Sequence, residues 1–387
     1  MNKKELELYI HIPFCVRKCS YCDFLSAPAT EQTREAYMAA LFAEIGGRAK
    51  DYSDRTVTSI FIGGGTPSLL SGEQIGQLMD RIREQFAMAQ DAEITMEVNP
   101  GTASAEKLRN FYTAGINRLS IGMQSAQAEE LKNLGRIHDF EGFCQVYREA
   151  VEAGFTNINV DIMSGLPGQT LASYRDTLEK VLHLEPMPQH ISAYSLIVEE
   201  GTPFAAMAER GELPLPEEET ERAMYEETIG VLAKYGFHRY EISNYARDGY
   251  ECRHNVGYWI RRDYLGFGIG AASLIDNVRF QNEKSLGAYL AHPLESREEE
   301  QTLTVQDRME ETMFLGLRLT RGVSCVDFAE QYGRTVEEVY GEVIARNVAD
   351  GLLTVTERKE NQKKDRFLAL TKRGLDLSNY VMAQFLF

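Results

Sequence analysis

Short apolar runs alternate with amphipathic segments over the first half of the chain. Six runs have the length and composition of buried strands: residues 6–12, 58–63, 93–99, 118–124, 158–163 and 190–198. Between them, amphipathic helical segments cover residues 31–50, 71–87, 104–113, 139–153 and 171–184. Strands that alternate with helices at this density form βαβ units around a parallel sheet. Six units are too few for a closed eightfold barrel, so we predict an α/β fold with an open, partial β/α barrel of about six parallel strands.

The pattern changes after residue 200. Residues 217–236 predict one long acidic helix, and residues 237–282 are rich in turns and aromatic side chains. The charged stretch at 295–301 is typical of a linker, and helices with a short hairpin follow it. We therefore expect a barrel domain at 1–295, with an extension over about 200–295, and a small, mainly helical C-terminal domain at 303–387.

Polar residues lie at the carboxyl ends of all six predicted strands. They are Cys15, the run Gly63–Thr66, Glu97 with Asn99, Gln124, Asp161 and the pair Tyr194–Ser195. A polar residue often ends a strand, but six such ends are more than a structural sheet requires. Because α/β barrels build their active sites at this edge, the pattern predicts a functional site there.

Composition and charge exclude several classes of protein. The chain has 387 residues, 43% of them hydrophobic and 26% charged, which is ordinary for a globular protein. No run of 18 apolar residues is present, and the N-terminal segment lacks the apolar core of a signal peptide, so we expect a cytoplasmic protein without a membrane span. A formal net charge of −17 argues against general nucleic-acid binding.

Three of the six cysteines are clustered within eight residues. Cys15, Cys19 and Cys22 have the spacing C-x3-C-x2-C, and no fourth cysteine follows at close range. Thiolates bind zinc and iron–sulfur clusters, and a four-iron cluster held by three of them keeps one iron open for an outside ligand. A zinc site completed by His11 or Cys252, or a redox disulfide, also remains open from the residues alone.

With its surroundings, the cysteine motif resembles the radical S-adenosylmethionine (SAM) superfamily. Tyr21 precedes the third cysteine, and the run GGGTP at 63–67 is similar to the superfamily's loop for the amino group of SAM. The resemblance implies a 4Fe-4S cluster on Cys15, Cys19 and Cys22, with SAM on the open iron. It further implies an electron donor protein, whose electron allows SAM to be cleaved to a 5′-deoxyadenosyl radical.

Further motifs resemble the coproporphyrinogen-oxidase-like branch of that superfamily. They are YIHIPFC, FIGGGTPS, EVNP, RLSIGMQS, LGRIH and DIMSGLPGQT, in this order. The likeness implies that Tyr21 shields the cluster. It also implies a SAM pocket formed by Tyr9, Gly64, Gly65, Thr66, Glu97, Gln124, Arg136, Asp161 and Ser195.

Two families of this branch are relevant. Oxygen-independent coproporphyrinogen III oxidases, which decarboxylate two propionates, typically carry a fourth cysteine where this chain has Phe24, and an extension before the motif. The run HNVGYW at 254–259 is instead similar to a motif of the HemW family of haem chaperones. This likeness implies a haem site at His254, Asn255, Tyr258 and Trp259 and transfer of haem to an acceptor protein, with coproporphyrinogen oxidation as the alternative.

The residues of this run can also be interpreted on their own. An imidazole is a common axial haem ligand, Tyr258 and Trp259 can stack on a porphyrin, and arginines can bind propionates. The arginines nearby are Arg253, Arg261 and Arg262. The structural alternative is a turn in which His254 and Asn255 cap backbone groups and Trp259 belongs to the core.

Overall fold

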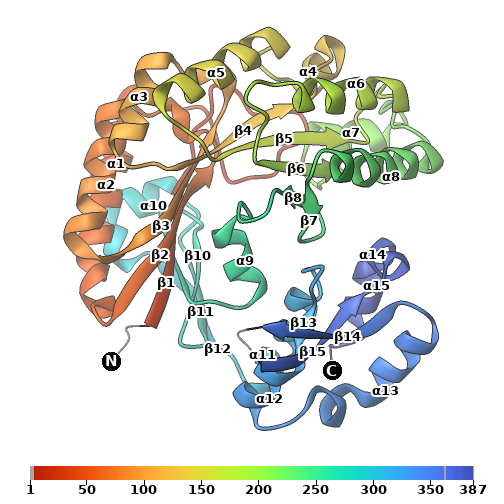
Figure 1. The fold of residues 1–387 in the computed structure, drawn as a ribbon. Helices are drawn as coiled ribbons and strands as arrows, with labels where there is room; N and C mark the ends of the chain where they lie inside the picture. Colours follow the sequence, from red (N-terminus) through yellow and green to blue (C-terminus); the bar gives the residue numbers. More distant parts are fainter. Residues whose placement is uncertain (1–3, 361–362, 387) are drawn as a thin grey trace.

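The computed structural model describes residues 4–360 and 363–386, and it confirms the predicted parallel sheet (Figure 1). Six parallel strands pair in chain order: β1 (Lys4–Ile12), β2 (Arg55–Gly64), β3 (Ala87–Val98), β4 (Arg118–Gln124), β5 (Ile158–Ser164) and β6 (His190–Ser195). Parallel pairing brings all six carboxyl ends to one edge of the sheet, where the polar residues were predicted to gather.

Helices cover the convex face of this curved sheet (Figure 1). The predicted helices are α1 (Glu31–Arg48), α2 (Gly72–Gln85), α3 (Ala105–Thr113), α5 (Phe140–Ala153) and α6 (Leu171–Leu182). Each begins directly after a Thr, Ser or Asp whose side chain accepts a hydrogen bond from a backbone N–H of the first turn. The short helix α4 (Ala128–Leu134) was not predicted, because seven residues give too little periodicity.

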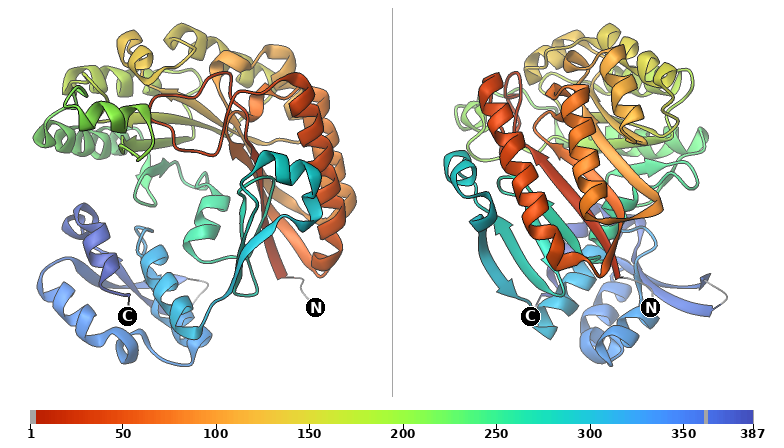
Figure 2. Two further views of the ribbon diagram at one scale, coloured as in Figure 1. Left: turned by 180° about the vertical axis from the view of Figure 1, so that it is seen from behind. Right: turned by 90° about the vertical axis from the view of Figure 1, so that its left-hand side faces the viewer.

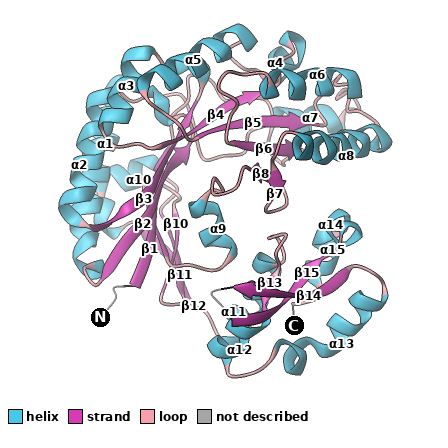
Figure 3. Ribbon diagram, viewed as in Figure 1, coloured by secondary structure: helices cyan, strands magenta, loops and turns pink. Residues whose placement is uncertain are grey.

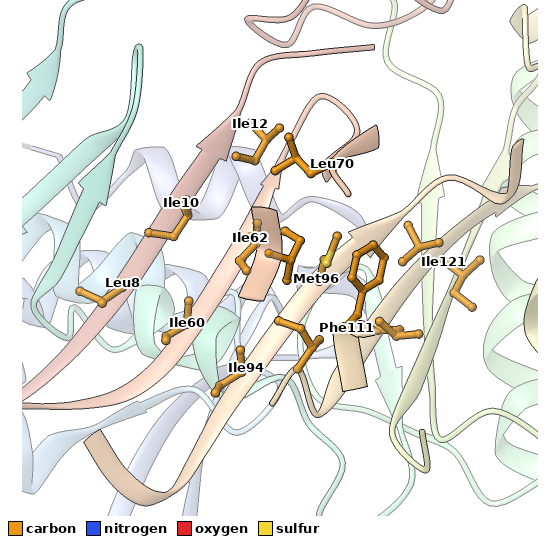
Figure 4. Packing of buried hydrophobic residues seen from close by; sticks show 14 of the residues in the cluster. Leu8, Ile10, Ile12, Ile60, Ile62, Leu70, Ile94, Met96, Phe111 and Ile121 are labelled. Atoms are coloured by element: carbon orange, nitrogen blue, oxygen red, sulfur yellow. The ribbon is translucent and has the colours of Figure 1, made fainter. Parts of the chain in front are cut away.

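The main hydrophobic core lies between the sheet and these helices. Figure 4 shows Ile10, Ile60, Ile62 and Met96 of neighbouring strands in this layer, with Phe111 of α3 packed against them. Alternate residues of a strand point to opposite faces, so the same strands can present other side chains to the concave face. The core therefore fixes the strand ends relative to one another.

The sheet continues beyond the six parallel strands at both edges. Beside β1 lie β9 (Tyr264–Phe267), β10 (Ala272–Ile275), β11 (Val278–Asn282) and β12 (Arg297–Thr302), and beside β6 lie β8 (Asn244–Ala246) and β7 (His238–Arg239). Within the described residues the two outermost strands, β12 and β7, do not pair with each other, so the barrel is open (Figure 3).

The linker predicted at 295–301 is wrong. These residues contribute most of β12, which pairs antiparallel with β11, for example Val278 with Thr302. All six residues of β12 are exposed, so the segment has no apolar alternation that could have indicated a strand. Its charges are typical of an edge strand, because they oppose pairing with other chains.

The C-terminal region forms a separate core of helices around a small sheet. Its elements are α11 (Val305–Gly316), α12 (Cys325–Tyr332), α13 (Val336–Ala349), α14 (Lys372–Asp376), α15 (Ser378–Ala383) and the strands β13 (Val323–Ser324), β14 (Leu353–Glu360) and β15 (Lys363–Leu370). Met313, Leu317 and Phe328 are buried in this core. Helix α9 (Arg253–Trp259) lies between the barrel and this region (Figure 2).

The remaining helices are α7 (Pro203–Glu209), α8 (Glu218–Lys234) and α10 (Leu286–Ala291). Helix α8 confirms the predicted acidic helix at 217–236. None of the helices in the described part of the chain is long and apolar enough to cross a membrane.

Candidate functional site

The three clustered cysteines line one cavity of about 320 Å³ at the carboxyl edge of the sheet, called the cluster cavity below. Their loop leaves β1 and crosses this edge, where the N–H of Gly65 donates to the carbonyl of Ile12 at 2.8 Å. A Cβ on Gly65 would lie 2.7 Å from the carbonyl oxygen of Phe14. Glycine at position 65, directly after β2, is therefore required for the close approach of the two loops.

The surroundings of the cysteines fit thiolate ligands of a cluster. Thr66 Oγ1 donates to Cys15 Sγ at 3.5 Å, and Arg136 Nη1 donates to Cys19 Sγ at 3.8 Å. Burial raises the pKa of the Cys22 thiol, so its ionisation requires a positive partner such as iron. An iron–sulfur cluster bound by Cys15, Cys19 and Cys22 meets this requirement.

A closed zinc site does not form from the described residues. No three of their His, Cys, Asp and Glu side chains converge closely enough to hold a single metal ion. The two residues considered as fourth ligands are engaged elsewhere. The ring of His11 binds Tyr9 and the carbonyl of Leu25, while Cys252 is buried beside Glu93.

Most of the residues predicted to shield the cluster or to bind SAM lie together in the cluster cavity. They are Tyr21, Gly64, Gly65, Thr66, Glu97, Gln124, Arg136 and Asp161. Glu97 Oε2 accepts from the N–H of Gly64 at 3.0 Å, and burial together with the nearby charge of Asp161 raises the pKa of Glu97 to about 7. No cationic side chain among the described residues pairs with Glu97. The cavity therefore favours a ligand that brings a positive charge.

Asp161 is the second buried carboxylate of this cavity. Its Oδ1 accepts from Asn159 Nδ2 at 2.7 Å, and Ser120 Oγ donates to the same carboxylate at 3.3 Å. Burial nevertheless raises the pKa of Asp161 to about 6. Arg136, which also lines the cavity, donates from Nη2 to the carbonyl of Gly122 at 2.7 Å. The cavity thus presents carboxylates and a guanidinium to one bound molecule.

Gln124 has a backbone conformation that is uncommon for a residue with a side chain. Its φ is 69°, and the pairing of β4 with β5 shifts register between Gly122 and Gln124. Such strain is concentrated at functional sites, where the surrounding structure maintains it. The irregularity turns Gln124 into the cluster cavity.

Two of the residues predicted for the SAM pocket lie elsewhere. Tyr9 does not line the cluster cavity, and its hydroxyl is 3.0 Å from His11 Nδ1. Ser195 does not line it either, and its Oγ is 3.2 Å from Ser164 Oγ. The neighbouring Tyr194 lines the cavity instead, because consecutive residues of β6 point to opposite faces. Ser120 and Met163 also line it and were missed.

A second cavity of about 720 Å³ adjoins the first and is called the interdomain cavity below. Its wall is largely aromatic and apolar and includes Tyr9, Tyr258, Trp259, Tyr264 and Leu274, with Phe314 and Leu315 of α11 on the side of the C-terminal domain. Phe24, Gly64 and Glu97 line both cavities. A ligand here would lie next to one in the cluster cavity.

Only two of the four residues predicted to bind haem line the interdomain cavity. Tyr258 and Trp259 line the interdomain cavity, whereas His254 and Asn255 line neither cavity. His254 is 1% exposed, its Nδ1 is 2.8 Å from Ser59 Oγ and its Nε2 is 3.0 Å from the Tyr258 hydroxyl. Burial lowers the pKa of His254 to about 3. Because both ring nitrogens are engaged, His254 positions Tyr258 and is not available as an iron ligand in this conformation.

The three arginines considered as partners of the haem propionates also differ in their surroundings. Arg253 pairs with Asp91 at 2.9 Å, and Arg262 pairs with Glu5 and Glu7 at 3.0 and 3.1 Å. Of the three, only Arg261 lines the interdomain cavity. The sequence could not separate them, because it does not say which of the three side chains turns toward the cavity.

The fold and the site define a class of protein. The model of the Radical SAM superfamily matches residues 9–181, and the model of the HemN C-terminal domain matches residues 303–377. The solved structure of coproporphyrinogen III oxidase HemN from Escherichia coli superimposes with a TM-score of 0.84 and 28% identity, and the match covers 99% of this chain and 90% of that one. The chain is therefore a radical SAM protein with a HemN-type C-terminal domain.

Relatives of known name specify the family. The heme chaperone HemW of Bacillus subtilis is 38% identical over 385 residues, which are 98% of each chain. HemW of Escherichia coli is 37% identical over 90% of this chain and 92% of its own. The chain belongs to the HemW family.

Proposed function

We propose that this chain is a haem chaperone. It binds a 4Fe-4S cluster through Cys15, Cys19 and Cys22 and SAM in the cluster cavity, and it binds haem in the interdomain cavity and passes it to an acceptor protein. The observation that carries this proposal is the interdomain cavity. Its size lies within the range of ligand sites, its wall is aromatic, and it adjoins the cluster cavity. Family membership supports the same function.

In the cluster cavity the chain's own residues orient SAM. The cluster, when bound, supplies an open iron for the methionine end and an electron. Glu97 and Asp161 offer negative charge to the cationic groups of SAM, and Arg136 offers positive charge to its carboxylate. Tyr21, which lies at the same wall among apolar residues, limits the access of water.

In the interdomain cavity the aromatic wall contacts the porphyrin. Tyr258 and Trp259 provide apolar, flat surfaces, and each large aromatic side chain contributes substantially to burial of the ligand. His254 acts indirectly, because its Nε2 holds the Tyr258 hydroxyl in place. An acceptor protein, an electron donor protein and a cytoplasmic location complete the proposal.

Haem titration tests this function. Absorption titration of the cluster-loaded protein should give one haem per chain. Trp259→Ala should weaken haem binding about tenfold, because it removes an aromatic contact with the porphyrin, and burial of such a side chain contributes roughly 1–3 kcal/mol. Tyr380→Ala is the control, since Tyr380 is 60% exposed on α15 and lies in neither cavity. Absence of stoichiometric haem binding would contradict the proposal.

The structural similarity to HemN favours one alternative, oxidation of coproporphyrinogen III. The same cavities would then place a porphyrinogen propionate next to SAM. We expect no conversion, because Phe24 stands where the oxidases typically have a further cysteine. Anaerobic incubation of the cluster-loaded protein with coproporphyrinogen III, SAM and a reductant decides the question. Formation of protoporphyrinogen IX would establish the enzyme.

A further inference from the structure

Two residues on the wall of the interdomain cavity carry buried N–H groups without an acceptor among the described residues. They are Nη2 of Arg261, whose side chain is 4% exposed, and Nε1 of Trp259. The guanidinium of Arg318 lies 4.3 Å from the centre of the Trp259 ring, and its Nε also has no acceptor there. Buried donors are nearly always paired, so unpaired donors at a cavity wall indicate that a ligand supplies the acceptor.

A carboxylate already lies against the same arginine. Glu311 of α11 is 6% exposed on its side chain; its Oε2 accepts from Arg261 Nε at 2.8 Å and its Oε1 from Arg279 Nη2 at 2.6 Å. Arg279 also lines the cavity. One carboxylate of the C-terminal domain therefore holds two arginines of the barrel domain. Arginine pairs of this kind bind planar anions, and Glu311 shows that the geometry suits a carboxylate.

We propose that Arg261, Arg279 and the indole N–H of Trp259 form a carboxylate-binding subsite of the interdomain cavity, with Glu311 as an internal competitor. The inference rests on the proposed haem binding and names the group that is recognised, a propionate of the porphyrin. An apolar, aromatic wall that ends in two arginines, with unpaired N–H donors on Arg261 and Trp259, matches a ligand with a flat apolar body and a carboxylate at its edge. Glu311 keeps the arginines in place while the cavity holds no ligand.

Masking the propionates tests the subsite. The probes are haem and haem dimethyl ester, titrated separately into the cluster-loaded protein by absorption spectroscopy. We expect the unmodified protein to bind haem about tenfold more tightly than the ester, because a charge-assisted hydrogen bond is lost on esterification. Glu311→Gln should increase haem affinity several-fold and leave ester affinity nearly unchanged, since only the ionised ligand competes with Glu311.

A double variant that removes both charges of the Arg261–Glu311 ion pair avoids the misfolding that a single unpaired buried charge could cause. Arg261→Gln combined with Glu311→Gln leaves no unpaired buried charge from that pair. We expect this double variant to bind the ester normally and to lose most of the gain in haem affinity that Glu311→Gln alone produces, since only Arg279 then remains for the propionate. The control is Arg175→Gln combined with Glu227→Gln, which makes the same charge changes in a distant ion pair of 2.8 Å. The control should keep the preference.

The outcomes distinguish failure of the carboxylate-binding subsite from failure of haem binding itself. Equal affinity of the unmodified protein for haem and ester, or a preference for haem that is as large in the Arg261/Glu311 double variant as in Glu311→Gln, would overturn the subsite alone. Failure of both haem and ester to bind stoichiometrically would instead contradict the proposed function, and the subsite would fall with it.

Discussion

At the scale of single residues, the three clustered cysteines have the clearest consequence. All three line the cluster cavity. Cys19→Ser should abolish cluster assembly, because a hydroxyl replaces the thiolate that iron requires. Iron and sulfide analysis after anaerobic reconstitution should give about four irons per unmodified chain and almost none for the variant. Cys144→Ser on α5 is the control, and normal iron content in Cys19→Ser would remove that residue from the cluster.

The buried carboxyl group of Glu97 predicts how the free energy of unfolding depends on pH. Its carboxyl has a pKa of about 7 in the folded chain, above the ordinary value of 4.5, so the folded state binds the proton more strongly than the unfolded state. The free energy of unfolding should therefore fall as the pH rises from about 4.5 to 7 and stay lowered above 7. Glu97→Gln removes this cost and should stabilise the protein at pH 8, by on the order of 3 kcal/mol at most, but little at pH 4.5.

Denaturant unfolding at both pH values, without SAM, measures this difference. Exposed Glu200→Gln serves as the control, because a carboxylate in water has no burial cost to remove. A stabilisation by Glu97→Gln that is equal at both pH values would contradict the assigned burial of the charge.

Single residues also mark the limit of what the sequence predicts about the site. The motifs identified Glu97, Gln124, Arg136 and Asp161, and the structure gathers all four in one cavity. Of the pair Tyr194–Ser195, Ser195 was assigned to the SAM pocket in place of Tyr194, because the sequence does not say which face of β6 turns to the cavity. His254 could not be recognised as a buried residue, since its two partners come from β2 and from the next turn of α9.

At the scale of elements, α9 is the part of the fold that places the aromatic wall. Glu93 of β3 accepts from the N–H groups of Arg253 and His254 at 3.1 and 3.2 Å, which fixes the first turn of the helix. Gly257 then packs against the carboxylate of Glu7, and a Cβ there would overlap its oxygens. The helix is therefore held at both its start and its middle.

This packing predicts the effect of one methyl group. Gly257→Ala should displace α9, destabilise the protein by about 1–3 kcal/mol and weaken haem binding, while cluster content stays normal. Gly341→Ala is the matched control, because a Cβ at that position of α13 has no neighbour within 4 Å and alanine is the better helix former. Thermal unfolding and haem titration measure the two effects. Equal behaviour of both variants would show that α9 is not closely packed at Gly257.

The elements themselves were predictable wherever burial imposes a period. The six parallel strands have apolar positions at a period of two, and the five helices predicted between them have an apolar face. Their expected bounds agree with the structure to within a few residues, apart from the starts of β2 and β3 and the end of β6. Helix α4 and strand β12 were missed, since one is short and the other is exposed along its whole length. Helix α9 was not predicted because its seven residues give too little periodicity.

At the scale of the whole molecule, the two cavities differ in which domain builds them. The residues around the cluster cavity all belong to the barrel, whereas the interdomain cavity is closed on one side by Phe314 and Leu315 of α11. Each domain has a hydrophobic core of its own. The interface between them is held by polar contacts such as Arg222 with Asp376 at 2.9 Å and Arg261 with Glu311 at 2.8 Å.

This division predicts that the two ligands protect different parts of the chain. Haem bound in the interdomain cavity should slow amide hydrogen exchange in α9 and in α11, because a ligand at 100 times its Kd stabilises the state that binds it by about 2.7 kcal/mol. SAM should protect the loops around Gly64 and Gln124 and leave α11 unchanged. Hydrogen-exchange mass spectrometry of the cluster-loaded protein with each ligand alone distinguishes the two patterns. Protection of α11 by SAM, or its absence with haem, would show that haem does not lie between the two domains.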